Sequence, residues 1–207
     1  TTDDTVVVLE LTAPWKVEFF LTLDVKNKKW SSEMLEACGI KEEQMPKLFE
    51  SYEPVGKVLP HIADQLGLGH DVTVAAGAGD NAGAAIGTST VGEGRCNISL
   101  GTSGTVFISS EKFGVDPHNA LHSFCHADGG YHLMGCMLSA ALCNMWFCGE
   151  ILNTTDYSGE QAQITEDMLG NNQVFFLPYL MGERSPINDV NARGTFTGIT
   201  MGTTRSD

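Results

Sequence analysis

Positive charge is scarce in this sequence of 207 residues. Twelve lysine and arginine residues stand against 26 aspartate and glutamate residues, which gives a formal net charge of −14. Because nucleic-acid binding depends on basic side chains that neutralise phosphates, we expect no nucleic-acid partner. Long apolar runs are also missing: no stretch reaches the about 18 consecutive apolar residues of a membrane helix. The first twenty residues lack the basic segment of a secretion signal, so we expect no membrane anchor and no export.

Closely paired cysteines are absent as well. The six cysteines are irregularly spaced and form no Cys-x-x-Cys pair: Cys38, Cys96, Cys125, Cys136, Cys143 and Cys148. Most lie in apolar stretches, where a reduced thiol packs as a small hydrophobic side chain. This pattern predicts free thiols in a reducing, cytoplasmic compartment.

The first part of the sequence predicts strands mixed with short helices. Strands are expected at 5–11, 15–25 and 71–77, and helices or helical turns within 29–40, 41–50 and 58–69. In the first of these helices, Ser31 or Ser32 is a candidate N-cap and Gly39 a candidate stop. These elements lead into a glycine-rich stretch at 74–87.

From Gly92 onward the pattern changes to alternating strands. Two of them predict a hairpin joined by Gly-Thr-Ser-Gly, and a third strand precedes a helix, which is how a ribonuclease-H-like α/β unit begins. The expected elements are strands at 95–100, 105–110 and 131–138, a helix at 139–152, a polar helical segment at 153–170, a buried strand at 173–180 and a loop-rich tail at 181–198. We expect a domain boundary between Ala85 and Gly92.

The stretch 74–87, "VAAGAGDNAGAAIG", places an acid inside a glycine turn. It formally matches the dinucleotide fingerprint Gly-x-Gly-x-x-Ala, but the Asp80 carboxylate would face the pyrophosphate that this turn binds, which disfavours the match. Two interpretations stay open. Asp80 or Asn81 is a helix N-cap, or Asp80 is a general base that accepts a proton from a substrate hydroxyl as it attacks phosphorus.

A second glycine-bounded segment follows at Gly101 to Gly104. Its two hydroxyl residues, Thr102 and Ser103, stand at the tip of the expected hairpin, where no large side chain blocks the approach of an anion. An ordinary hairpin turn is the alternative, although Asn-Gly or Asp-Gly would be the commoner solution. The residues favour a phosphate-binding loop.

Several motifs together resemble the central part of xylulokinases in the FGGY carbohydrate kinase family. They are, in order, "GAGDNAGAAIG", "SLGTSGTVF", "HSFCHADGGYHLMGCMLSAA" and "FLPYLMGERSPINDVNARGTFTGIT". With "LDVKNKKWS" and "YEPVGKVLP" upstream, the resemblance covers roughly residues 23–200. It implies an α/β actin-like ATPase fold of two ribonuclease-H-like domains, here the tail of the first domain at 1–88 and the first half of the second at 89–207.

The resemblance also implies a reaction and a role for each matching residue. The reaction is ATP-dependent phosphorylation of D-xylulose to D-xylulose 5-phosphate, with Mg²⁺ accompanying ATP. Asp80 would be the catalytic base, Asp80 and Asn81 would contact the sugar, and the loop of Gly101, Thr102, Ser103 and Gly104 would face the transferred phosphoryl group. It allows a homodimer of the full-length enzyme.

The chain departs from the family pattern at both ends. The acidic-Gly-Thr phosphate loop of the first domain and the Gly-Gly-Gly-Ala adenosine loop of the second are not in these 207 residues. We therefore expect a central piece of the enzyme that is inactive by itself. A non-catalytic truncated or pseudokinase module, and an FGGY kinase for another sugar or polyol, are the alternatives.

Two further clusters favour structural roles. The histidines and cysteines between residues 118 and 136 fit no closed zinc pattern, so no metal site is expected and the histidines are predicted to pack or hydrogen-bond. Glu183 and Arg184 are predicted to form a buried ion pair that fixes the loop after "FLPYL".

Overall fold

The computed structural model describes residues 22–207. The strand expected at 5–11 and the larger part of that at 15–25 lie outside the described residues. The chain forms two compact units. Unit 1 comprises residues up to Asn97 with Phe107–Val115 and His122–Leu133, and unit 2 comprises Ile98–Val106, Asp116–Leu121 and Met134–Asp207.

Unit 1 begins with a small hairpin and a capped helix. Strand β1 (Leu23–Asp24) pairs antiparallel with β2 (Lys29–Trp30), and α1 (Ser32–Cys38) follows. The Ser31 hydroxyl accepts the Met34 N–H at 3.3 Å, which satisfies one of the donors left free at a helix start. Gly39 ends the helix in the left-handed conformation at φ 67°, so the expected stop is confirmed.

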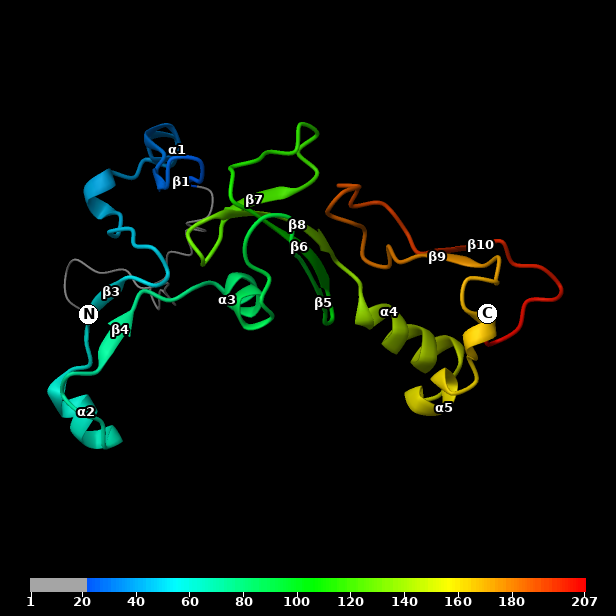
Figure 1. The fold of residues 1–207 in the computed structure, drawn as a ribbon. Coiled ribbons are helices and arrows are strands. Elements are labelled where there is room, and N and C mark those ends of the chain that lie inside the picture. Colours follow the sequence, from blue (N-terminus) through cyan, green and yellow to red (C-terminus); the bar gives the residue numbers. More distant parts are fainter. Residues whose placement is uncertain (1–21) are drawn as a thin grey trace. The chain divides into compact units, whose positions relative to one another are not determined.

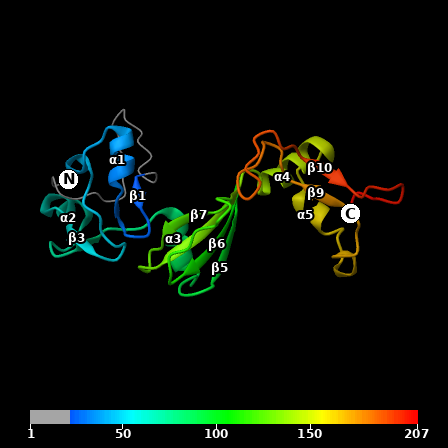
Figure 2. The same cartoon turned by 90° about the horizontal axis from the view of Figure 1, so that it is seen from above.

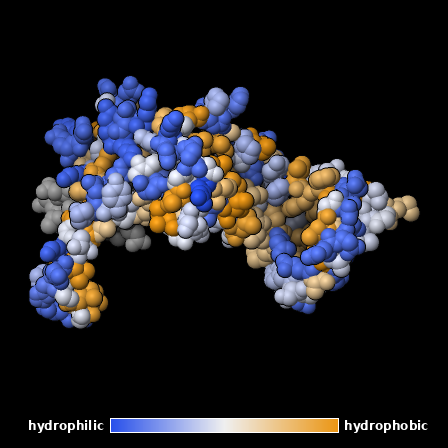
Figure 3. All heavy atoms as spheres, viewed as in Figure 1, coloured by the Kyte–Doolittle hydropathy of each residue, from blue (hydrophilic) through white to orange (hydrophobic). Residues whose placement is uncertain are grey.

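A second antiparallel pair leads towards the glycine-rich stretch. After the 3₁₀ turn η2 (Glu42–Gln44), strand β3 (Pro54–Lys57) pairs with β4 (Thr73–Ala75), and α2 (Pro60–Leu66) lies between them in sequence. The sequence predicts α2 and β4, whereas β3 is an addition from the structure. Figure 3 shows apolar residues on one side of α2. Leu66 in the helix is 66% exposed and Leu59 directly before it 52%, so the helix is amphipathic.

Helix α3 (Asp80–Gly87) follows β4 and lies beside the unit 1 part of a four-stranded sheet (Figures 1 and 2). The sheet contains β5 (Cys96–Leu100), β6 (Gly104–Ser110), β7 (His122–Cys125) and β8 (Tyr131–Met137), in the order β5-β6-β8-β7. The three strands expected here are confirmed, and β7 is an additional edge strand.

The core of unit 1 lies against this sheet. Phe107 on β6 is only 1% exposed and packs against two buried histidines, His126 and His132. Away from the sheet, small or single apolar side chains are buried, among them Leu35, Ala63 and Ala85. Among the described residues of this unit, Phe107 is the largest fully buried side chain.

Unit 2 contains the helix that follows β8 and a two-stranded sheet. Helix α4 (Ala141–Trp146) continues into a π-helical turn η3 (Phe147–Ile151), and then come α5 (Tyr157–Gln161) and η4 (Glu166–Met168). Strand β9 (Phe175–Leu177) pairs antiparallel with β10 (Thr195–Thr197). The expectation that β9 is buried is wrong, since Phe175 is 64% and Leu177 42% exposed.

Within residues 22–207, every helix is too short or too polar to cross a bilayer.

Candidate active site

Asp80 is the first residue of α3, directly after the turn Ala76 to Gly79. Gly77 adopts φ 85°, a conformation that favours glycine, and Gly79 occupies the N-cap position without a side chain to cap the helix. The expectation that Asp80 or Asn81 is the N-cap is therefore wrong in position, because the helix starts one residue earlier. Asp80 itself is exposed to solvent.

One oxygen of the Asp80 carboxylate is used locally. Its Oδ1 accepts the Asn81 N–H at 2.7 Å and the Asn81 side-chain Nδ2 at 3.2 Å. The negative charge lies in the first turn of α3, where the exposed N–H groups of the helix favour it. These contacts orient the carboxylate and leave Oδ2 available to a substrate hydroxyl, because no partner within the described residues is recorded for it.

The segment Gly101 to Gly104 connects β5 and β6 as a tight loop. The carbonyl groups of Gly101 and Thr102 accept the N–H groups of Ala141 and Ala140, at 2.9 and 3.0 Å. Because its carbonyls face the start of α4, the loop is held by its backbone. The exposed Thr102 and Ser103 have no recorded acceptor for their N–H groups in the part of the chain that the structure describes.

Gly104 has a steric requirement that Gly101 lacks. A Cβ atom at Gly104 would lie 2.9 Å from Met137 Cγ, closer than real Cβ atoms come, and 3.0 Å from Ala140 Cβ, a tight contact. At Gly101 a Cβ atom would meet only the Ser103 carbonyl oxygen, at 3.6 Å, an ordinary contact. Gly104 thus permits close packing of the loop on α4, and Gly101 leaves its outer side open. Exposed N–H groups on a fixed loop fit a phosphate group.

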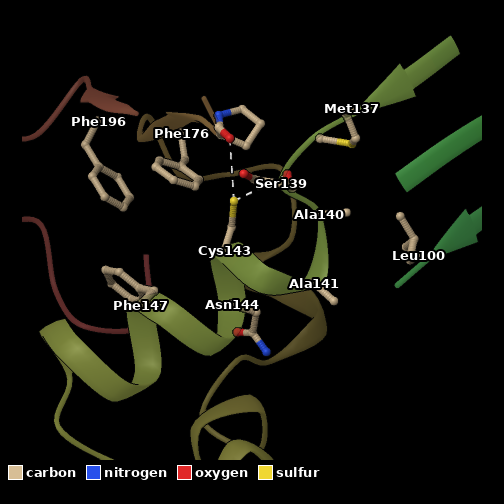
Figure 4. Close-up of a pocket in the computed structure, with 11 residues that line it drawn as sticks. Leu100, Met137, Ser139, Ala140, Ala141, Cys143, Asn144, Phe147, Phe176 and Phe196 are labelled. Carbon is tan, nitrogen blue, oxygen red and sulfur yellow. Dashed lines mark hydrogen bonds between the residues drawn. The ribbon is translucent and has the colours of Figure 1, made fainter. Parts of the chain in front are cut away.

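A pocket of about 500 Å³ lies next to this loop in unit 2 (Figure 4). Its wall is mostly apolar and includes Phe147, Phe176 and Phe196, with Ala140 and Ala141 from the start of α4. The Phe176 and Phe196 rings stack with their centroids 4.5 Å apart. The pocket thus combines stacked aromatic rings with the residues that hold the phosphate-loop candidate.

Two polar side chains, Ser139 and Cys143, also line this mostly apolar pocket. Ser139 is fully buried, and its hydroxyl has no hydrogen-bond partner among the described residues. The Cys143 thiol contacts the carbonyl oxygens of Ser139 and Pro178, at 3.4 and 3.6 Å, and burial raises its pKa. A thiol with a raised pKa stays protonated at neutral pH and is a poor nucleophile.

Two of the histidines expected to pack or hydrogen-bond, His126 and His132, do so in unit 1, whereas His118 is exposed in unit 2. His126 is 2% exposed, its Nε2 lies 2.9 Å from the Thr90 carbonyl oxygen, and its Nδ1 accepts the Ala127 N–H at 2.8 Å. His132 stacks on Phe107 with centroids 3.9 Å apart, and desolvation lowers its pKa to about 4. Both rings therefore belong to the packed interior.

The cysteine thiols near these histidines are protonated and free. Burial raises the pKa values of Cys125 and Cys136, and all six cysteines are unpaired. Among residues 22–207, no three His, Cys, Asp or Glu side chains come together as a metal-binding group.

Glu183 fixes the loop after β9 through backbone contacts. Its side chain is buried, and Oε1 accepts the N–H groups of Leu138 at 3.0 Å and of Arg184 at 2.7 Å. The anticipated buried ion pair is wrong in one respect, since Arg184 is exposed. Glu183 instead joins the end of β8 to the loop through hydrogen bonds to N–H groups.

Two parts of the chain match known protein-family domains. Residues 19–87 match the N-terminal domain of the FGGY family of carbohydrate kinases, and residues 96–207 match its C-terminal domain. The chain belongs to the FGGY family. Between the two matched segments lie residues 88–95, a linker of eight residues.

Curated FGGY relatives include bacterial xylulose kinases. The chain is 42% identical to the xylulose kinase of Escherichia coli K12 over 179 residues, which cover 86% of this chain and 37% of that enzyme. It is 41% identical to the xylulose kinase of Klebsiella pneumoniae, with the same shares covered. The chain thus spans somewhat more than a third of the length of these relatives.

Solved FGGY structures confirm the expected fold class. A xyloylose kinase from Brucella ovis is 39% identical and superposes with a TM-score of 0.81, covering 89% of this chain and 38% of that one. A ligand-bound xylulose kinase from Lactobacillus acidophilus is 28% identical with a TM-score of 0.76, and the same shares are covered. The chain has the α/β actin-like, ribonuclease-H-like fold of these kinases.

Within this family fold, the structure assigns the candidate residues to different units. Asp80 and Asn81 lie in unit 1, and Gly101, Thr102, Ser103 and Gly104 lie in unit 2. The sequence suggests a packing role for Ser139 and not its place in the pocket lining, and it does not point to Thr90, whose carbonyl oxygen lies against His126. The serine directly before two alanines was the available signal for the first, and no local pattern marks the second.

Proposed function

We propose that this chain takes part in ATP-dependent phosphorylation of a ketopentose, with D-xylulose giving D-xylulose 5-phosphate. One observation carries the proposal: the stretch that contains both Asp80 and the Gly101 to Gly104 loop is 42% identical to a xylulose kinase. The proposal covers the enzyme of which this stretch forms a part, with 1–88 belonging to its N-terminal and 89–207 to its C-terminal family domain. The proposal also places this enzyme in the cytoplasm, and the six free thiols of the chain support that location.

Asp80 acts as the general base in this proposal. Its exposed carboxylate, held through Oδ1 by Asn81, accepts the proton of the substrate hydroxyl while the hydroxyl oxygen attacks the terminal phosphorus of ATP. Asn81 lies beside it and contributes to sugar binding through its side-chain amide. A well-placed base contributes about 10² to 10⁴ in rate.

The Gly101 to Gly104 loop holds the phosphoryl group. Its exposed N–H groups at Thr102 and Ser103 donate to phosphate oxygens, and its contacts with Ala140 and Ala141 keep them in place. Mg²⁺, bound to the ATP phosphates, supplies charge neutralisation during transfer. Water exclusion from the site protects ATP from hydrolysis.

The test compares Asp80→Asn with Asp71→Asn in the full reading frame that encodes this chain. Asp71 is a matched control because it is also an exposed aspartate of unit 1. We expect Asp80→Asn to lower turnover of D-xylulose by about 10² to 10⁴ while sugar affinity stays near normal, and Asp71→Asn to change neither. ADP release with D-xylulose is followed in a coupled assay.

Three outcomes would overturn this proposal in part or in whole. Near-normal turnover in Asp80→Asn removes Asp80 from the role of base. A higher kcat/KM for glycerol or gluconate than for D-xylulose overturns the assigned substrate while leaving a sugar or polyol kinase. Absence of turnover with every substrate favours a non-catalytic module.

A further inference from the structure

The linker between the two family-domain matches, residues 88–95, has a tightly turned backbone. Three of its residues have positive φ values: Ser89 at 58°, Gly92 at 81° and Gly94 at 69°. This conformation is accessible to glycine at little cost but disfavoured for a residue such as serine. A linker in a turned conformation needs contacts that keep it there.

Hydrogen bonds continue α3 directly into this linker. The Thr90 N–H donates to the Ala85 carbonyl oxygen at 2.8 Å, and the Thr88 hydroxyl donates to the Ala84 carbonyl oxygen at 2.9 Å. The same hydroxyl oxygen accepts from Asn97 Nδ2 on β5, also at 2.9 Å. The start of the linker is thereby joined to the end of the helix that carries Asp80.

The turn between β7 and β8 holds the middle of the linker. His126 Nδ1 accepts the Ala127 N–H, so the ring carries its proton on Nε2, which donates to the Thr90 carbonyl oxygen at 2.9 Å. Two residues later in the same turn, Asp128 Oδ2 accepts the Gly92 N–H at 3.3 Å. One turn therefore contacts the linker at two points.

Strand β6 holds the linker from its other side. Ser109 is 1% exposed, and its hydroxyl lies 2.5 Å from the Gly92 carbonyl oxygen and 3.2 Å from that of Arg95. Both backbone groups of Gly92 thus have partners, one on Asp128 and one on Ser109. All these residues lie in unit 1.

Little of helix α3 is buried. Ala85 is its one buried apolar side chain, and Ile86 is 44% exposed. Burial of an alanine methyl group removes little apolar surface from water, so hydrophobic packing alone holds this helix weakly. The hydrogen bonds to the linker therefore matter more here than in a well-buried helix.

We propose that His126 and Asp128 are positioning residues that latch the linker 88–95 to the β7–β8 turn and thereby fix the end of α3. In this role they act on Asp80 only through the helix, and they contact no substrate. The functional consequence rests on the proposed function of Asp80, whereas the latch itself is a property of the chain. The two claims can be tested separately.

Hydrogen exchange of individual backbone amides in this chain tests the latch. His126→Phe keeps an aromatic ring against Phe107 but removes the bond to Thr90, and His126→Gln keeps a side-chain N–H that reaches the same carbonyl. We expect His126→Phe to speed exchange at Thr90 and Gly92 about five- to tenfold, and His126→Gln to restore most of the protection. If His126 only packs, the order reverses, since Phe packs better than Gln, and the latch is overturned.

Two further variants keep this test decisive. His132→Phe alters the neighbouring buried histidine, which has no bond to the linker, and should leave exchange at Thr90 and Gly92 unchanged. Asp128→Ala removes an acceptor from a partly exposed side chain, so it spares the aromatic core and should speed exchange at Gly92. An unchanged Gly92 in Asp128→Ala, or an equal effect of His132→Phe, contradicts the latch.

Kinetics of the full reading frame test the consequence for Asp80. We expect His126→Phe to lower kcat about tenfold with little change in the KM for the sugar, and His126→Gln to recover it. An unaltered kcat alongside faster exchange would confirm the latch and overturn its effect on Asp80. If the unaltered enzyme has no kinase activity, the proposed function fails while the exchange data still decide the latch.

Discussion

Aromatic rings gather at two places in this molecule, and their surroundings differ. In unit 1, Phe107 is 1% exposed and packs against His126 and His132, and Phe124 stacks on His132. In unit 2, Phe147, Phe176 and Phe196 surround a pocket of about 500 Å³. Similar rings thus form a filled core in one unit and the wall of a hollow in the other.

This difference affects how much each group of rings contributes to stability. A ring packed on all sides contributes its full burial and dispersion energy to stability, whereas a ring beside a hollow contributes only part of it. The partly exposed rings can instead offer their faces to another apolar group. Stability should therefore depend on the unit 1 cluster more than on the unit 2 rings.

Phe107→Ala should produce the largest loss of stability. Removal of a buried phenylalanine side chain costs about 4 kcal/mol, because a cavity forms among side chains that cannot fully collapse. Urea denaturation followed by circular dichroism, with hydrogen exchange of β6 and β8 amides, measures it. A loss below about 1 kcal/mol would mean that the cluster is not a rigid core.

The next effect is a pH dependence that arises from His132. Its pKa falls from 6.5 to about 4 on folding, so the unfolded chain binds the extra proton between these values. Stability from this group is complete above pH 6.5 and is lost as the pH falls towards 4. We expect the free energy of unfolding to drop by about 2 kcal/mol between pH 7.5 and pH 5.

His132→Phe isolates this contribution, because it removes the titrating group and keeps a ring against Phe107. The drop between pH 7.5 and pH 5 should shrink by about 2 kcal/mol in the variant. An identical pH dependence in both proteins would show that the His132 ring is accessible to water.

Phe196→Ala should give the smallest change. This ring is 37% exposed and borders the pocket, so we expect a loss of about 1 kcal/mol. The same denaturation experiment, with hydrogen exchange of β9 and β10 amides, measures it. A loss as large as that of Phe107→Ala would show that the pocket is filled in solution and would abolish the contrast between the two units.

Local signals in the sequence predicted the elements whose ends depend on near neighbours. Ser31 and Gly39 marked the start and end of α1, and the glycines after Leu66 marked the end of α2. A helix cap needs only a side chain or a backbone conformation within a few residues, so it can be predicted from the local sequence alone. The hairpin of β5 and β6 could be predicted for the same reason.

Long-range contacts decided what the sequence could not predict. Strand β7 has four residues and becomes a strand because β8 lies beside it. Strand β9 has an apolar pattern typical of burial, yet Phe175 is exposed, since burial depends on what covers a strand. Asp80 was predicted as a candidate from its glycine neighbours, whereas the hydrogen bond at Thr90 comes from a histidine 36 positions away.

The glycine at 104 has a mechanical consequence. It leaves no room for a side chain against Ala140, and two backbone bonds from Ala140 and Ala141 join the loop to the start of α4. Those two alanines also line the aromatic pocket. A ligand that displaces the loop therefore also moves the part of the pocket wall that these two alanines form.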